Sequence, residues 1–106
     1  MEQKTVFLGI FGTSPLMRVL DFLVVNEEFD YSMKDIARLS GVGYATLKLM
    51  WPRLERNQII RQTRTIGKAK MYRLNRGNLI IRKFKDFYWD ITKQAVGKEA
   101  KQEILA

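Results

Sequence analysis

The sequence predicts a mainly α-helical domain that carries a small β-ribbon, in the α+β class. Apolar residues recur at helical spacing in three stretches before residue 57 and in one stretch after residue 78. Between them lies a run of strand-forming residues, 59–74, with a glycine inside it. The chain has 106 residues, which is room for one hydrophobic core. The expected order is helix, short strand, helix, helix, strand, strand, helix.

Residues 1–13 form an apolar arm in this prediction. The segment Thr5–Phe11 fits either a short strand or an apolar extension. Because an exposed apolar patch of this kind favours association, we expect it to pack on its own domain or on a second copy.

The stretch Ser14–Asn26 predicts the first helix. Ser14 suits the capping position and Pro15 suits the first helical position. One apolar stripe at helical spacing comprises Leu16, Val19, Leu20, Leu23 and Val24. After a polar connector, Tyr31 is expected to begin a short edge strand.

Two short helices with a tight turn between them are predicted for residues 32–39 and 44–56. Ser32 and Asp35 stand at the spacing of a conservative capping box. Gly41 falls where the chain must turn, and glycine adopts the left-handed conformation without steric cost. Pro52 predicts a kink in the second helix or a new helical start. Inward-facing positions at helical spacing are Leu47, Met50 and Leu54.

Residues 59–74 predict a two-stranded ribbon that turns at Gly67-Lys68. Its expected inner residues are Ile59, Ile60, Ile66, Tyr72 and Leu74. The basic residues expected on its outer face or tip are Arg61, Arg64, Lys68 and Lys70. The alternation breaks at Gln62-Thr63, which leaves the register open.

The last helix is predicted from Leu79 to about Ala95, with Asn78 as its cap. Ile81, Phe84, Tyr88, Ile91 and Ala95 follow the three–four spacing of a heptad seam, and Ile80 and Phe87 widen it. We therefore interpret residues 77–106 as a dimerisation element and these seven residues as its interface. The alternative is that the helix only covers the core of its own chain.

Four residues carry a resemblance to a known family. Ala37, Gly41, Val42 and Leu47 stand at the spacing of a helix-turn-helix motif, and residues 59–74 resemble the β-wing that follows it. Over roughly residues 14–91 the chain resembles the small winged helix-turn-helix transcription regulators of archaea and bacteria. The resemblance implies a DNA-binding domain at 14–76, and a wing tip at Ile66–Ala69 that reaches the minor groove or the backbone.

The charge distribution indicates a polyanionic partner. The net charge is +8, and residues 44–76 hold nine basic side chains against Glu55 alone. This asymmetry predicts one cationic face. On the second helix of the motif, which fits the major groove, the predicted DNA-binding residues are Tyr44, Ala45, Thr46, Lys48, Leu49 and Arg53. On the wing they are Arg61, Arg64, Lys68 and Lys70.

The composition argues against several other classes of protein. With neither cysteine nor histidine, the commonest metal ligands and the commonest general base are missing, so we predict no enzyme, no metal site and no cofactor. No stretch approaches the roughly 20 apolar residues of a membrane span. The expected location is cytoplasmic, with no membrane partner.

The resulting hypothesis is a homodimeric regulator of transcription that binds double-stranded DNA in a sequence-specific way. One alternative is a winged-helix module for protein–protein interaction. Another is a replication or partition protein of plasmid or virus type that uses the same fold on DNA. RNA binding is disfavoured because Tyr44 is the sole aromatic residue of the predicted readout region. The operator and any effector ligand stay open.

Overall fold

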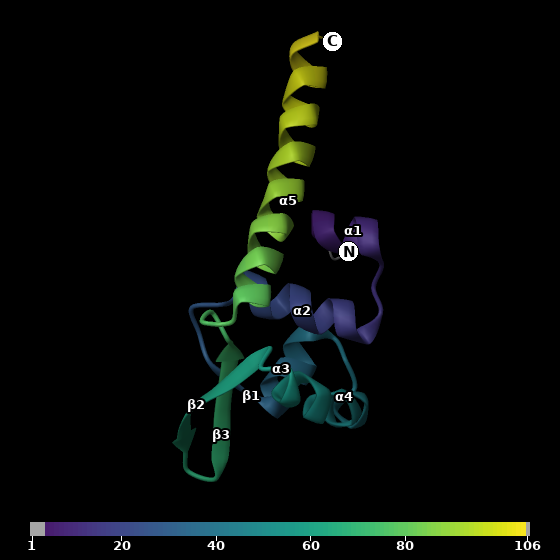
Figure 1. Ribbon diagram of the computed structural model, residues 1–106. Coiled ribbons are helices and arrows are strands. Elements are labelled where there is room, and N and C mark those ends of the chain that lie inside the picture. The colour runs from purple at the N-terminus through teal and green to yellow at the C-terminus, as the bar shows by residue number, and fades with distance from the viewer. Residues whose placement is uncertain (1–3, 106) are drawn as a thin grey trace.

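The computed structural model describes the backbone of residues 4–105 and the side chains of residues 4–98. Figure 1 shows a body built from α2, α3, α4 and the sheet, from which α5 rises with α1 beside it. In chain order the elements are α1 (Val6–Phe11), α2 (Pro15–Val25), β1 (Tyr31–Ser32), α3 (Met33–Ser40), α4 (Tyr44–Arg56), β2 (Ile60–Ile66), β3 (Ala69–Leu74) and α5 (Leu79–Leu105). From α2 onward, the predicted order and the α+β class are confirmed.

The N-terminal arm is a short helix, which corrects the expectation of a strand or an extension. The Thr5 side chain caps α1 by accepting a hydrogen bond from the backbone N–H of Leu8. Phe7 is buried, with its ring 5.4 Å from that of Phe84 and 5.2 Å from that of Tyr88. The apolar run is six residues long, too short for its period to distinguish a helix from a strand.

The predicted caps and turn of the helix pair are present. Ser32 accepts a hydrogen bond from the N–H of Asp35, and Gly41 adopts the left-handed conformation with φ 73°. The Arg18 guanidinium on α2 donates to the carbonyl oxygen of Gly41 at 2.9 Å, which ties the turn to α2. The helix α4 runs through Pro52 without interruption, so no new helix starts there.

The three-stranded antiparallel sheet has the order β1-β3-β2. Its register pairs Ile60 with Leu74, and a bulge lies between Gln62 and Arg64, where the sequence alternation breaks. Leu74 and Ile60 point into the core as predicted, whereas Ile66 near the tip is half exposed. The expectation that Ile66 faces inward is corrected, because the bulge places Ile66 on the face opposite to Tyr72 and Leu74, on the part of the ribbon that extends beyond the helices (Figure 1).

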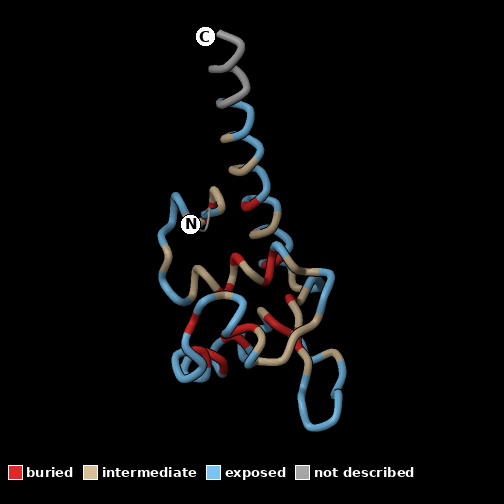
Figure 2. Tube along the Cα trace, turned by 180° about the vertical axis from the view of Figure 1, so that it is seen from behind, coloured by how far each residue is buried: buried red, intermediate tan, exposed pale blue. Residues whose placement is uncertain are grey.

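The core lies where α2, α3, α4 and the sheet meet, and Figure 2 shows its buried positions concentrated there. Leu23, Ile36 and Leu47 are fully buried in it. Trp51 is also buried, edge-on to Tyr72 of the wing with ring centroids 4.9 Å apart. This pair supports the base of the wing from beneath.

The heptad seam of α5 faces the chain's own core. Ile81 and Tyr88 are 2% and 1% exposed, and the Tyr88 hydroxyl donates to Asp21 on α2 at 2.6 Å. This corrects the assignment of Ile81 and Tyr88 to a dimer interface. The neighbouring seam residues Phe84 and Ile91 pack partly against the same core, while Ile80 and Phe87 are exposed.

Candidate nucleic-acid interface

The exposed face of α4 begins directly after the tight turn. Leu47, Met50, Trp51 and Leu54 hold the helix to the core, so the opposite face meets solvent. All six residues predicted on this helix are exposed: Tyr44, Ala45, Thr46, Lys48, Leu49 and Arg53. The helix lies at the end of the body opposite to the rising α5 (Figure 1), so the face is open for a large ligand.

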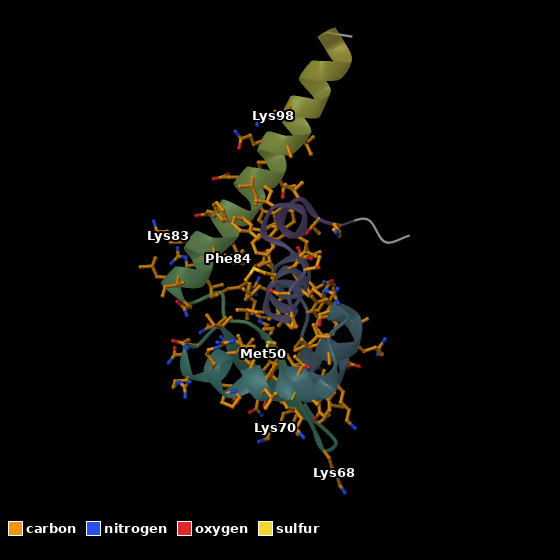
Figure 3. The ribbon with its side chains drawn as sticks, turned by 90° about the vertical axis from the view of Figure 1, so that its right-hand side faces the viewer. Met50, Lys68, Lys70, Lys83, Phe84 and Lys98 are labelled. Carbon is orange, nitrogen blue, oxygen red and sulfur yellow. The ribbon has the colours of Figure 1, made fainter. Side chains whose placement is uncertain are left out.

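A groove of about 430 Å³ separates the start of α4 from the wing. Three lysines line it, with no acidic residue among its lining side chains: Lys34 from α3, Lys68 from the turn and Lys70 from β3. Figure 3 shows Lys68 at the free end of the hairpin, pointing away from the body. Such a groove concentrates positive potential and suits a phosphate backbone.

Tyr44 lines this groove, and its ring lies close to two ammonium groups. The Nζ atoms of Lys34 and Lys48 lie 5.9 Å and 5.2 Å from the centroid of its ring. Both distances fall within the range of cation–π attraction. The ring therefore helps to hold Lys34 at the groove and Lys48 on the exposed side of α4.

The opposite face of the wing carries Arg61 and Arg64. Lys70 pairs with Thr65, whereas Arg64 pairs with Met71 one position along, so Arg64 and Lys70 point to opposite faces. The bulge brings Arg61, opposite Arg73, onto the same face as Arg64. This corrects the expectation for Lys70, which lies on the side of the groove and not with Arg61 and Arg64 on the outer face.

Arg64 is also engaged within the chain. Its Nε and Nη2 atoms donate to the two carboxylate oxygens of Asp30 at 2.9 and 3.1 Å, and the Thr63 hydroxyl donates to Asp30 at 2.5 Å. These hydrogen bonds, that of Arg64 first, lower the pKa of Asp30 to about 2. The pair fixes β2 to the loop before β1, so the role of Arg64 in this structure is to position the wing.

A second groove of about 560 Å³ follows the other side of α4, against the start of α2. Arg53 and Arg56 line it together with Ser14 and Pro15. Arg56 and Lys34 were missed as candidate residues. Their signal was present in the sequence, since helical spacing places Lys34 and Arg56 on the polar faces of the two motif helices.

The cations that flank α4 define what the surface can bind. Lys34, Lys68 and Lys70 lie on its wing side, and Arg53 and Arg56 lie on its α2 side. A single helix fits the ~12 Å major groove of DNA, whose two phosphate backbones run along either edge. The surface thus presents a groove-sized helix with positive charge on both sides.

Within residues 4–98, side chains of the metal-binding types do not gather in any group of three or more. Across the described helices, none combines the length and the apolar character needed to cross a bilayer.

The helix pair, its tight turn and the hairpin behind it define a winged helix-turn-helix fold. Solved structures with this fold are similar to the chain, at 20% sequence identity or less. One is MepR, a transcription regulator of the Staphylococcus aureus multidrug efflux pump MepA, with a TM-score of 0.60 and 18% identity over 79% of this chain. No protein-family model and no curated protein sequence matches the chain.

Two further structures show the same fold in DNA-binding proteins. ZitR of Lactococcus lactis in complex with DNA gives a TM-score of 0.58 at 13% identity over 80% of this chain. The match covers 60% of the MepR chain and 60% of the ZitR chain, so this chain spans about three fifths of their length. Sso10a-2, a DNA-binding protein of Sulfolobus solfataricus, gives 0.54 at 14% identity over 87% of this chain and 96% of its own.

Proposed function

We propose that the chain binds double-stranded DNA in a sequence-specific way and regulates transcription as a homodimer. The observation that carries the proposal is the exposed face of α4 with cations along both of its sides. In this arrangement α4 enters the major groove. The lysines on the wing side neutralise one backbone, and the arginines on the α2 side neutralise the other.

The comparisons support the proposal. ZitR, which shares the fold, has been solved in complex with DNA, and MepR is a transcription regulator. The net charge of +8 supplies the long-range attraction that speeds association with a polyanion.

The homodimer is supported by an apolar patch, formed by Ile10 and Phe11 of α1 with Ile80 and Phe87 of α5. These side chains are between 45% and 70% exposed, and the rings of Phe11 and Phe87 lie 5.7 Å apart. Ile80 and Phe87 are seven residues apart and therefore share one side of α5, next to the seam that seals the core. In a twofold homodimer the two α4 helices would meet half-sites about 10 bp apart, or a multiple of that spacing.

DNA binding is tested by fluorescence anisotropy on duplexes selected from genomic fragments, with a salt titration. Contacts from about six cations give an expected log–log slope near −5. The triple variant Lys48→Ala/Lys68→Ala/Lys70→Ala should lose most of the affinity. The matched triple Arg82→Ala/Lys83→Ala/Lys93→Ala, which removes the same charge from α5, should keep it. Failure of the wild-type chain to bind any duplex at low salt would remove the proposal.

The dimer is tested separately by sedimentation velocity at micromolar concentration. Phe87→Ser places a hydroxyl in the patch and should shift the chain to monomer. Val25→Ser is the matched control, since Val25 is 48% exposed at the end of α2 and lies outside the patch. A wild-type chain that sediments as a monomer would overturn the dimer while leaving DNA binding intact.

The same apolar patch also fits a winged-helix module that binds another protein, and this is the second candidate function. In that case the triple lysine variant would retain its partner, whereas Phe87→Ser would lose it. A replication or partition protein would make the same DNA contacts as a regulator. The identity of the selected locus separates those two roles.

A further inference from the structure

Leu49 is the most exposed large apolar residue of the described chain. It is 85% exposed, although α4 has four buried positions that hold the helix to the core. Its place on the helix follows from the advance of about 100° per residue. The mean direction of Leu47, Met50, Trp51 and Leu54 defines the inner side of α4, and Leu49 lies almost opposite to it.

The centre of the outer face is apolar along more than one turn. Ala45 precedes Leu49 by one turn and Pro52 follows it by nearly one, and all three are exposed. The charged side chains Lys48 and Arg53 lie on the two flanks of this stripe. The positions that would face the floor of a major groove therefore offer methyl and methylene groups, with cations to either side.

Base edges in the major groove present several hydrogen-bonding groups but a single apolar group, the C5-methyl of thymine. An arginine, asparagine or glutamine at the centre of the face would favour guanine or adenine. None stands at Ala45, Leu49 or Pro52, and Arg56, which lies on the same side, comes only at the last residue of α4. Charge complementarity favours DNA as the occupant of the stripe, because cations on both sides would draw it to a phosphate-lined groove. Apolar contact is then the readout that remains for the part of the face between Ala45 and Pro52.

We infer that Leu49 reads the C5-methyl group of thymine, with Ala45 beside it, and so requires thymine at a fixed position of each half-site. The inference rests on the proposed function and names the DNA feature that this site recognises. One helical turn separates the two side chains by about 6 Å along the axis. The methyl contacts therefore fall on one base pair or on two neighbouring ones.

The experiment replaces each thymine of a selected duplex, one at a time, by deoxyuridine, which lacks only the C5-methyl group. For the wild-type chain, Kd from fluorescence anisotropy should rise about three- to fivefold at one position, or at two neighbouring positions, of each half-site. For Leu49→Ala, thymine and deoxyuridine at the position under Leu49 should give the same Kd. The control Leu39→Ala removes an exposed leucine from α3 and should preserve the wild-type pattern.

Each other outcome overturns the inference in a recognisable way. Equal Kd values for thymine and deoxyuridine at every position would overturn methyl readout and leave DNA binding standing. A selected pool without enriched thymine would do the same. If Leu49→Ala weakens binding but still responds fully to the methyl group, Leu49 is not the reader. Absence of all duplex binding at low salt is the separate failure of the proposed function.

Discussion

Arg64 of the wing and Asp30 of the loop after α2 form a two-point ion pair, Nε to Oδ2 at 2.9 Å and Nη2 to Oδ1 at 3.1 Å. Asp30 is 14% exposed and Arg64 is 63% exposed, so the carboxylate is enclosed while the guanidinium borders solvent. The pair joins segments that are 34 residues apart. It fixes the bulged part of β2 to the body of the domain, and thereby sets the direction in which the wing projects.

The ion pair predicts a pH-dependent contribution to stability. The pKa of Asp30 in the folded chain is about 2, below the usual value of roughly 3.9 in an unfolded chain. A carboxyl group with a lowered pKa stabilises the fold fully above the unfolded value, and this stabilisation is lost as the pH falls toward 2. Asp30→Asn should therefore lower Tm at pH 6, and its difference from wild type should shrink between about pH 4 and pH 2.

Thermal unfolding followed by circular dichroism across that pH range measures the effect. Asp86→Asn is the control, because Asp86 is an exposed carboxylate of α5 that takes part in no ion pair within residues 4–98. It should track the wild-type curve throughout. A Tm difference for Asp30→Asn that stayed constant down to pH 2 would show that the stabilisation does not come from the ionised carboxylate.

The division of the wing's cations predicts unequal roles in DNA binding. Lys70→Ala removes a charge from the groove beside α4 and should reduce the magnitude of the salt slope by about 1. Arg64→Ala should leave the slope unchanged and lower Tm, since Arg64 is held by Asp30 on the other face. Anisotropy titrations at several salt concentrations distinguish the two. A lowered slope for Arg64→Ala with an unchanged slope for Lys70→Ala would reverse the assignment of the faces.

The turn of the motif yields a prediction about backbone conformation. Gly41 has φ 73°, where a side chain costs roughly 1–2 kcal/mol, so Gly41→Ala should destabilise the fold by about that amount. Gly9→Ala is the matched control, because Gly9 lies inside α1 with open space around its Cβ position. Alanine there should stabilise the fold by roughly 0.5–1 kcal/mol. Urea unfolding measures both variants, and equal effects of the same sign would contradict the argument.

Local sequence signals predicted the helix pair and its turn well. Ser32, Asp35 and Gly41 act within a few residues of themselves, so capping and turn geometry could be inferred from the sequence alone. The spacing of Leu47, Met50 and Leu54 likewise gave the inner side of α4, and hence its exposed face. These features depend on helical periodicity, which a sequence displays directly.

Features set by tertiary packing were not predictable in the same way. The faces of Arg61 and Arg64 depend on a bulge that moves a strand by one residue, and the sequence marks only a broken alternation there. The heptad spacing of α5 is the same whether a second copy or the chain's own α1 and α2 cover it. Because α1 was not recognised as a helix, its ring contacts with Phe84 and Tyr88 could not be foreseen.

The attachment of α5 gives the final prediction. Asp21 is buried on α2 and accepts hydrogen bonds from the Tyr88 hydroxyl at 2.6 Å and from the Thr5 hydroxyl at 2.5 Å. Burial first, and then the bond to Asp21, raises the pKa of Tyr88, so the phenol stays protonated and donates. Tyr88→Phe keeps the ring contact with Phe7 but leaves the Asp21 carboxylate one hydrogen-bond donor short. It should lower the free energy of unfolding, measured in urea, by about 1.5–3 kcal/mol.

Thr92→Val is the control, because the Thr92 hydroxyl donates to the carbonyl oxygen of Tyr88 within its own helix. This variant should lower the free energy of unfolding by less than about 1 kcal/mol. A Tyr88→Phe chain as stable as wild type would mean that ring packing alone attaches α5 to the domain.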